Sequence, residues 1–357
     1  MDFKHILITG GAGFVGSTLG VRFRQAFPSL AVTAFDNLLR RGSELNLPRL
    51  RAAGVAFVHG DVRCPQDFET LPPFDLLIDC SAEPSVQAGA HGSPLSVLEI
   101  NLVGTIHCLE AARRHNAAFL FLSTSRVYPI SLLNGLDFEE RETRFAWKDR
   151  QTVPGCSGRG ISEGAPLDGA RSFYGASKLA GELLLQEYAA TCRMPALINR
   201  CGVLAGPWQM GKADQGVAAL WVARHLFELP LRYIGFGGQG KQVRDILHVE
   251  DLFDLVCLQC RNLACWDGRA YVVGGGLDRS ISLQELTALC REATGRKIVI
   301  TPSPETSPLD VRIFVADSAS AMKDFGWRPM RDLETVVRDI SSWIQAHREM
   351  VRTIFAG

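Results

Sequence analysis

The sequence predicts an α/β fold, with a doubly wound parallel sheet in the larger part and a smaller, discontinuous α/β region after it. Up to residue 203, short apolar runs bounded by Gly, Pro or Asp alternate with helical patterns. Such alternation requires right-handed crossovers between parallel strands that are covered on both faces. Beyond residue 203 the rhythm becomes irregular, which indicates the second region.

The expected strands are short, apolar and partly β-branched, and they cover residues 5–9, 31–35, 55–60, 74–80, 118–124, 195–201 and 270–275. Helical periodicity covers residues 14–27, 95–116, 174–192, 216–229 and 249–263. Residues 131–170 are polar and rich in Gly, Arg and acids, which is typical of a surface excursion or of a lid over an active site.

The composition argues against several kinds of partner. Lys plus Arg and Asp plus Glu both number 38 in 357 residues, so we expect no general attraction to nucleic acid or membranes. The sequence has no uninterrupted apolar run of membrane-span length and no signal-peptide pattern at its start. We therefore expect a cytoplasmic protein.

The ten cysteines lack the spacing of a disulfide framework. Cys257 and Cys260 form a C-x-x-C pair, for which a metal or redox role is open. Because no second ligand pair lies nearby, buried free thiols are the preferred interpretation. We predict no metal site.

A glycine-rich turn joins the first strand to the first helix. The spacing of Gly10, Gly13 and Gly16 permits a sharp turn, a close backbone approach to a diphosphate and tight helix–sheet packing. The helix start, with Phe14 and Val15, offers unpaired N–H groups and the positive end of the helix dipole. The turn therefore predicts a dinucleotide site.

Asp36 lies twenty positions after Gly16, at the end of the second strand. A carboxylate there accepts hydrogen bonds from the adenosine ribose and repels a 2′-phosphate. This favours NAD over NADP, although Arg40 and Arg41 stand close in sequence. The rest of the predicted cofactor site follows the later strands and comprises Asn37, Asp61, Val62, Ser81, Ala82, Asn101 and Ser123. For Asp61 a plain turn role is equally open.

A proton-transfer pair is predicted at the start of the helix that follows the fifth strand. Tyr174 and Lys178 are four residues apart and share one helix face. A phenol with a reference pKa of about 10 needs about 4 kcal/mol of help to work at a pH of about 7, and a neighbouring ammonium stabilises the phenolate. The alternative is an exposed structural pair.

Ser123, Thr124 and Ser125 stand at the C-terminal end of the fifth strand, where open α/β sheets bind ligands. Position in the motif favours Thr124 as the hydroxyl that bonds the reacting group. At least one of the three is expected only to satisfy backbone groups at the strand end.

Together these residues resemble the extended short-chain dehydrogenase/reductase family, the NAD-dependent epimerases and dehydratases of nucleotide sugars. The likeness runs end to end and includes RDILHVEDL (244–252) and GWRP (326–329). It implies a Rossmann-type fold, tightly bound NAD and a homodimer. Within the family the likeness is strongest to 2-epimerases of CDP-linked sugars, through residues 36–47, 57–63, 213–217, 240–252 and 311–317.

The resemblance implies transient oxidation of one sugar carbon. Tyr174 removes the hydroxyl proton, hydride passes to NAD, the keto-sugar turns over, and hydride returns to its other face. The implied substrate-binding residues are Glu83, Thr124, Ser125 and Arg126 near the sugar, with Arg244 and Arg312 on the diphosphate. For Arg244 a structural ion pair with Asp245 or Asp251 stays open, and for Glu83 a capping role.

Three alternatives stay open. A UDP-sugar 4-epimerase shares the same proton-transfer set. A sugar 4,6-dehydratase typically has an Asp-Glu pair where this chain has Ser125 and Arg126, and a non-catalytic dinucleotide-binding protein should have lost the Thr, Tyr and Lys. The departures from the family pattern lie near the sugar, at Pro129 and at Ser81-Ala82-Glu83.

Two domains are expected. Residues 1–203 with about 241–276 form the NAD-binding Rossmann domain. About 204–240 with 277–357 form the nucleotide-sugar-binding domain.

Overall fold

The computed structural model describes residues 3–211 and 215–355; residues 213 and 214, part of one stretch that carries the family likeness, lie outside the described residues. The chain forms two compact units. Unit 1 comprises Met1–Val127, Ser172–Arg200 and Phe253–Tyr271, and unit 2 comprises Tyr128–Arg171, Cys201–Leu252 and Val272–Gly357. Residues 128–171, 201–203, 241–252 and 272–276, expected in the first domain from the sequence, thus group with unit 2. The ligand of each domain stays a prediction.

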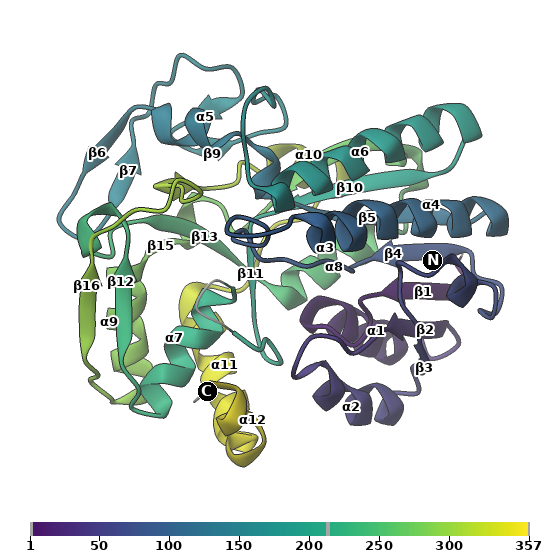
Figure 1. The fold of residues 1–357 in the computed structure, drawn as a ribbon, viewed down its shortest axis with the longest axis horizontal. Helices are drawn as coiled ribbons and strands as arrows, with labels where there is room; N and C mark the ends of the chain where they lie inside the picture. The colour runs from purple at the N-terminus through teal and green to yellow at the C-terminus, as the bar shows by residue number, and fades with distance from the viewer. Residues whose placement is uncertain (1–2, 212–214, 356–357) are drawn as a thin grey trace. The chain divides into compact units, whose positions relative to one another are not determined.

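A seven-stranded sheet is the centre of the first part of the fold, in the order β14-β10-β5-β4-β1-β2-β3 (Figure 1). Its strands are β1 (His5–Thr9), β2 (Ala31–Asp36), β3 (Ala56–His59), β4 (Leu76–Asp79), β5 (Ala118–Thr124), β10 (Ala196–Cys201) and β14 (Asp267–Val273). Strands β3, β2, β1, β4 and β5 pair in parallel. The strand order reverses between β1 and β4, which is the switch point of a doubly wound sheet. The predicted fold class is confirmed.

Most helices of unit 1 follow the predicted periodicity closely; these are α1 (Phe14–Ala26), α3 (Leu95–Leu98), α4 (Gly104–His115) and α6 (Phe173–Cys192). Helix α2 (Leu47–Ala52) lies where no helix was predicted, and α8 (Val249–Gln259) crosses the boundary between the units. A π-helical turn, Glu99–Val103, joins α3 to α4. Left-handed residues end two of the helices, Asn116 after α4 and Arg193 after α6.

The helix Leu95–His115 is the one helix among the described residues that is long and apolar enough to cross a membrane by length and composition. Of its apolar window, 44% is buried within the protein. Its α4 part packs on β4, β5 and α6, and Figure 1 shows α4 and α6 side by side.

The core of unit 1 lies between the sheet and these helices. Every residue of β4 and β5 is buried. Leu109 from α4, Leu185 from α6 and Phe121 from β5 belong to one buried apolar cluster. Each fully buried side chain of this size contributes about 2 kcal/mol, so the cluster fixes α4 and α6 on the sheet.

Outside residues 128–171, the described residues of unit 2 form two further sheets. Strands β11 (Val203–Ala205), β13 (Val243–His248) and β15 (Ser280–Ser282) form one, with β17 (Ile313–Phe314) paired to β13, and β12 (Leu231–Ile234) pairs in parallel with β16 (Ile300–Ser303). The helices are α7 (Val217–Leu226), α9 (Leu283–Thr294), α10 (Ala319–Phe325), α11 (Leu333–Ala346) and α12 (Arg348–Phe355). Helix α7 packs on α9 and α11.

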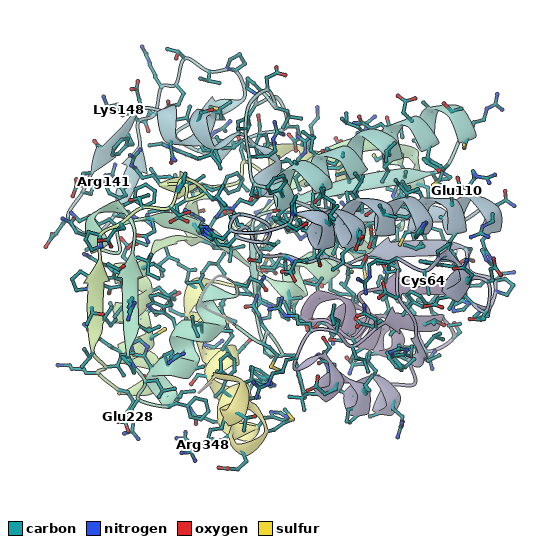
Figure 2. The ribbon with its side chains drawn as sticks, in the orientation of Figure 1. Cys64, Glu110, Arg141, Lys148, Glu228 and Arg348 are labelled. Atoms are coloured by element: carbon teal, nitrogen blue, oxygen red, sulfur yellow. The ribbon has the colours of Figure 1, made fainter. Side chains whose placement is uncertain are left out.

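The segment 128–171 has regular structure of its own within unit 2. It contains α5 (Ile130–Gly135), a hairpin of β6 (Phe138–Glu140) and β7 (Phe145–Trp147), and a second hairpin of β8 (Cys156–Ser157) and β9 (Gly160–Ile161). The Phe145 N–H donates to the Lys241 carbonyl at 2.9 Å, and Ile161 forms a β-bridge with Ala316. Figure 2 labels Arg141 and Lys148 on the first hairpin. The segment is therefore anchored to unit 2.

Candidate active site

The glycine turn is crowded by backbone. Gly10 has a positive φ of 61°, and a Cβ there would lie 2.7 Å from the Cys80 carbonyl oxygen. A Cβ on Gly16 would lie 2.3 Å from the Gly10 carbonyl oxygen. Gly13 caps α1 without a side-chain hydrogen bond, and Phe14 and Val15 begin the helix. A cradle that side chains would fill, next to an uncapped helix start, fits the diphosphate of a dinucleotide.

Asp36 fastens the turn to the end of β2. Its carboxyl accepts hydrogen bonds from the Ala12 N–H at 3.0 Å and the Leu38 N–H at 2.8 Å. Burial is the largest influence on the pKa of Asp36 and raises it. Asn46, which the sequence analysis did not single out, donates to the Ala12 carbonyl at 2.9 Å. An Asn in a turn-rich stretch carries no signal that separates this contact from an ordinary turn role.

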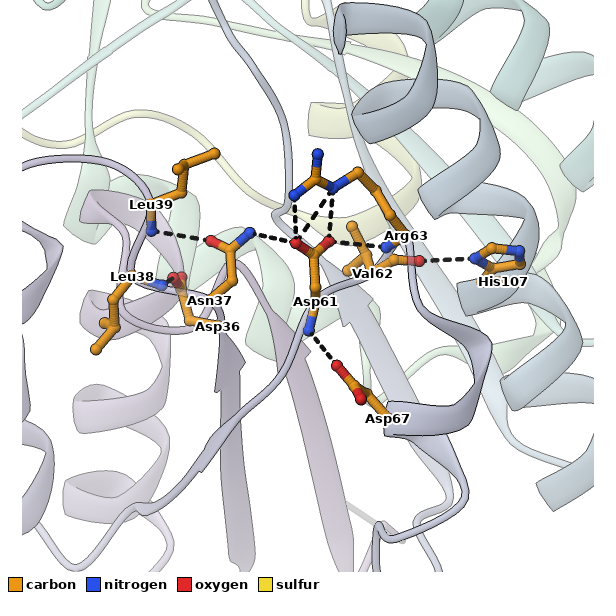
Figure 3. A network of polar contacts seen from close by, with 9 residues as sticks. All are labelled: Asp36, Asn37, Leu38, Leu39, Asp61, Val62, Arg63, Asp67 and His107. Atoms are coloured by element: carbon orange, nitrogen blue, oxygen red, sulfur yellow. Dashed lines mark hydrogen bonds and ion pairs between the residues drawn. The ribbon is translucent and has the colours of Figure 1, made fainter.

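Asp61 is the centre of a polar network (Figure 3). Asn37 donates to it at 2.9 Å, and the Arg63 guanidinium contacts both carboxyl oxygens, with the shortest distance at 2.6 Å. These Arg63 hydrogen bonds hold the pKa of Asp61 well below its usual range. The next residue, Val62, is buried, and its carbonyl lies 2.8 Å from the His107 ring. The structure thus brings Asn37 and Asp61 together.

Asp79, at the end of β4, is fully buried and was missed by the sequence analysis. One carboxyl oxygen accepts from the Thr9 hydroxyl at 2.8 Å and from the Ser81 hydroxyl and N–H at 2.6 and 3.0 Å. The other accepts from the Thr105 hydroxyl at 3.1 Å. Asp79 therefore fixes Ser81, and with it the start of the segment that contains Ala82 and Glu83. The one sequence signal for Asp79 is its place at the end of an apolar strand.

Asn101 holds Glu83 through the backbone. The Asn101 amide accepts from the Glu83 N–H at 2.8 Å and donates to the Glu83 carbonyl at 3.1 Å. It also donates to the Ser177 hydroxyl on α6 at 3.2 Å. The Glu83 carboxyl accepts from the Ser85 N–H at 3.0 Å, so the capping role left open for Glu83 is present. Asn101 lies in the π-helical turn, a feature that often marks functional sites.

The hydroxyls at the end of β5 have different partners. Ser123 donates to the Glu182 carboxyl at 2.5 Å, and Glu182 forms a buried ion pair with Arg200 at 2.7 Å. Thr124 accepts from the Arg126 N–H at 3.2 Å. Ser125 and Arg126 begin the short turn that follows β5. Of the three hydroxyls, Ser123 thus has the partner expected of a structural group, whereas its cofactor role stays a prediction.

Tyr174 and Lys178 lie on the first turns of α6, one turn apart. The N-cap Ser172 accepts from the Gly175 N–H, which fixes the helix start beside Tyr174. Lys178 is buried, and its Nζ lies 3.8 Å from the centre of the Phe121 ring. Helix α6 packs on β5 and on the turn after β5. Tyr174 and Lys178 therefore lie on a helix that contacts the strand of Thr124.

The two arginines expected on the diphosphate lie in unit 2. Arg312 is stacked on the Phe138 ring at 4.1 Å, and burial lowers its pKa. Arg244 donates to the carbonyls of Val243 and Val311, each at 2.7 Å. Asp251, one partner considered for Arg244, forms an ion pair with Arg331 at 2.6 Å.

The buried carboxyl of Asp245, the other partner considered for Arg244, accepts from two backbone N–H groups, those of Gly276 and Ala316. Burial raises the pKa of Asp245 to about 6. This carboxyl therefore has a structural role against backbone.

The cysteines of the C-x-x-C pair are free thiols. Burial raises the pKa of Cys257 to about 12 and that of Cys260 further. Among residues 3–211 and 215–355, the structure contains no group of three or more His, Cys, Asp or Glu that could hold a metal ion.

Comparison with known proteins agrees with this geometry. The model of the NAD dependent epimerase/dehydratase family matches residues 6–274. The chain belongs to this family. A CDP-paratose 2-epimerase of Salmonella typhi is 31% identical over 95% of the chain and 98% of that protein. A dTDP-glucose 4,6-dehydratase of Streptomyces antibioticus is 29% identical over 96% of the chain and 93% of that protein.

Among solved structures, the UDP-glucose 4-epimerase of Thermus thermophilus in complex with NAD superposes with a TM-score of 0.73. It is 26% identical, and the match covers 96% of this chain and 99% of that one. The family assignment establishes an enzyme that depends on NAD and acts within the epimerase/dehydratase class, and the resemblance inferred from the sequence is confirmed.

Removing the Arg63 guanidinium tests the network around Asp61. Hydrogen bonds from Arg63 lower the pKa of Asp61. The pair therefore stabilises the fold fully above the unfolded-state pKa of about 4, and this stabilisation decreases as the pH falls from there through the lowered folded-state pKa. We expect Arg63→Gln to lower the free energy of unfolding by about 1 kcal/mol at pH 7, and the difference to shrink below a pH of about 4.

Urea denaturation at pH 7 and pH 3 measures this. Arg141→Gln is the control, because Arg141 pairs with Glu139 at an exposed site, where such pairs contribute little. A deficit in Arg63→Gln that is as large at pH 3 as at pH 7 contradicts the electrostatic explanation.

Proposed function

We propose that this chain is a nucleotide-sugar epimerase that oxidises and re-reduces one sugar carbon, and that the reaction is 2-epimerisation of a CDP-linked sugar. The observation that carries the proposal is the residue set at the end of β5 and the start of α6. Thr124, Tyr174 and Lys178 supply hydroxyl, phenol and ammonium. Ser125 and Arg126 follow Thr124 where a dehydratase typically has an acid pair, which favours epimerisation over loss of water.

Tyr174 removes the proton from the reacting sugar hydroxyl and later returns it. An ammonium about 6 Å from a phenolate contributes about 3 kcal/mol at an effective dielectric constant of about 20, which is most of the shift that the phenol needs. Lys178 is buried against Phe121, whose ring face stabilises the ammonium without neutralising it. Bound NAD supplies the acceptor and donor of hydride.

Thr124 orients the sugar. Its hydroxyl oxygen accepts from the Arg126 N–H, so the hydroxyl proton can be donated to the sugar oxygen that Tyr174 deprotonates. Glu83, Ser125 and Arg126 complete the sugar-binding set by their positions beside Ser81 and Thr124. Arg244 and Arg312 bind the substrate diphosphate, because a guanidinium fork meets phosphate oxygens two at a time.

The cofactor-binding residues are assigned by position along the sheet edge. The backbone of Gly10, Gly13, Phe14, Val15 and Gly16 binds the NAD diphosphate, and Asp36 accepts from the ribose hydroxyls. The remaining assigned residues lie toward the adenine and nicotinamide ends and comprise Asn37, Asp61, Val62, Ser81, Ala82, Asn101, Ser123, Tyr174 and Lys178.

Tyr174→Phe removes the proton-transfer group while the helix stays intact. We expect kcat to fall at least about 100-fold, because general acid–base catalysis contributes about 10² to 10⁴, and the NAD content of the purified protein to stay unchanged. The control is Tyr188→Phe on the same helix, whose hydroxyl bonds to Glu110. A Tyr174→Phe enzyme as active as wild type rejects the catalytic assignment.

Substrate class is tested with a panel of CDP-, UDP-, GDP- and dTDP-sugars in ordinary and deuterated buffer. We expect a CDP-sugar to change configuration at C2 with no solvent deuterium at that carbon, because the hydride stays within the site. Turnover of a UDP-sugar at C4 instead supports the rival assignment, which the Thermus thermophilus likeness favours. A product that has lost water identifies a dehydratase.

We also propose a homodimer formed through α3, the π-helical turn and α6. This part of unit 1 exposes four apolar side chains, Leu95, Val103, Phe173 and Leu183. Exposed apolar side chains grouped on packed helices are typical of an interface. Helix α6 contacts both α3 and the π-helical turn, so one partner surface could cover all four.

Leu183→Glu places a charge in that surface, since Leu183 is 57% exposed. We expect analytical ultracentrifugation to give a dimer for wild type and a monomer for this variant. Met330→Glu is the matched control, because Met330 is 70% exposed on unit 2 and should leave the dimer intact. Equal sedimentation of wild type and Leu183→Glu contradicts this interface.

A further inference from the structure

We propose that Asn134 is a positioning residue for Arg312, and that the segment 128–171 thereby sets how tightly the enzyme holds the nucleotide diphosphate of its substrate. The proposal rests on the function proposed above, since it takes Arg312 as a group that binds the diphosphate. It assigns a role to a segment that the sequence suggested only as a surface excursion or a lid.

Asn134 lies in α5 and makes three hydrogen bonds to the loop before β17. Its side-chain oxygen accepts from the Arg312 N–H at 2.8 Å, and its amide nitrogen donates to the Asp310 carbonyl at 2.9 Å. Its own carbonyl accepts from the Arg312 guanidinium at 3.2 Å. Because one side chain fixes the backbone on both sides of residue 311, it determines where the Arg312 side chain starts.

Three aromatic rings then hold the guanidinium. Its central carbon lies 4.1 Å from the centre of Phe138, 5.4 Å from Phe236 and 5.7 Å from Phe145. The rings pack edge to face on one another, Phe138 with Phe145 and Phe145 with Phe236. Phe138 and Phe145 belong to the β6–β7 hairpin, so this aromatic collar (Phe138, Phe145 and Phe236) comes largely from the same segment as Asn134.

Within the part of the chain that the structure describes, Arg312 forms no ion pair, and burial lowers its pKa. An arginine still stays protonated near neutral pH. Arg312 is half-buried, and a partly desolvated cation without a carboxylate is destabilised. Binding of a diphosphate to the guanidinium offsets this destabilisation.

Asn134 and the collar also preserve the donors that an anion needs. A guanidinium has five N–H groups, and one of them donates to the Asn134 carbonyl. Aromatic ring faces attract the cation, but they do not accept hydrogen bonds from the N–H groups that lie in the plane of the guanidinium. A carboxylate in their place would compete with the diphosphate for the same fork.

The test is a double-mutant cycle on the NAD-containing enzyme, with CDP and UDP as the probes in calorimetry. We expect Arg312→Ala to weaken binding of the preferred nucleotide about 100-fold. We expect Asn134→Ala to weaken it about tenfold, because hydrogen bonds to a charged group contribute free energies of this size. In the Arg312→Ala background, Asn134→Ala should weaken binding less than about twofold, because its effect passes through Arg312. In turnover, Asn134→Ala should raise KM about tenfold and leave kcat within about twofold.

Two further variants separate positioning from general stability. Gln151→Ala removes the hydrogen bonds that join Gln151 to Asp137 and Lys148 at the base of the hairpin, without touching residues 310–312; it should leave nucleotide affinity within about twofold. Phe138→Leu keeps an apolar side chain but removes the ring. We expect it to weaken nucleotide binding about threefold in the wild-type background and to have no effect in the Arg312→Ala background. This variant replaces Asn134→Ala in the cycle if Asn134→Ala does not fold.

The outcomes are distinct. Additive losses from Asn134→Ala and Arg312→Ala, or a loss in Gln151→Ala equal to that in Asn134→Ala, overturn the positioning role. Weakening by Arg312→Ala together with no effect of Asn134→Ala overturns only this inference. If neither nucleotide binds the wild-type enzyme, the proposed function itself is wrong.

Discussion

The arrangement of unit 1 depends most on the buried carboxyl group of Asp79. It lies at the switch point between β1 and β4, where water cannot reach it, and four donated hydrogen bonds replace water. Because an unsatisfied buried polar group costs several kcal/mol, the elements that carry Thr9, Ser81 and Thr105 must meet in one geometry. The same corner limits the glycine turn, since Gly10 lies against the backbone of residues 80 and 81. One satisfied carboxyl thus links the order of the strands to the glycine turn.

Local signals made the sheet, the long helices and the placement of Tyr174 and Lys178 on one helix predictable. The glycine spacing and the interval from Tyr174 to Lys178 are patterns that span only a few neighbouring residues, so they can be recognised in the sequence. The helix predicted over 95–116 is observed over 95–115. The contacts that sequence reasoning missed join distant parts of the chain. Asn134 meets Arg312 across 178 positions, and the strands of segment 128–171 have only two or three residues, too few for a period to be recognised.

In each unit, a cation assigned to the site rests on an aromatic ring; Lys178 is buried and Arg312 is half-buried. Lys178 lies 3.8 Å from the Phe121 ring in unit 1, and Arg312 lies 4.1 Å from the Phe138 ring in unit 2. A ring face stabilises a cation through its quadrupole and leaves the net positive charge in place. In the function proposed above, Lys178 acts on the Tyr174 phenolate and Arg312 on the substrate diphosphate. Arg200 is another buried cation of unit 1, and it pairs with the carboxylate of Glu182.

The π-helical turn at Glu99–Val103 has an implication for how this chain could change by insertion or deletion. A π-turn contains one residue more than a regular helical turn. Losing that residue would let α3 and α4 run on as one ordinary helix, with no break in the backbone hydrogen bonds. Every later side chain would then rotate by about 100° relative to those before it, and the amide of Asn101 would leave the Glu83 backbone. A single-codon deletion here would thus keep a helix of normal appearance and lose the register that places Asn101 against the Glu83 backbone.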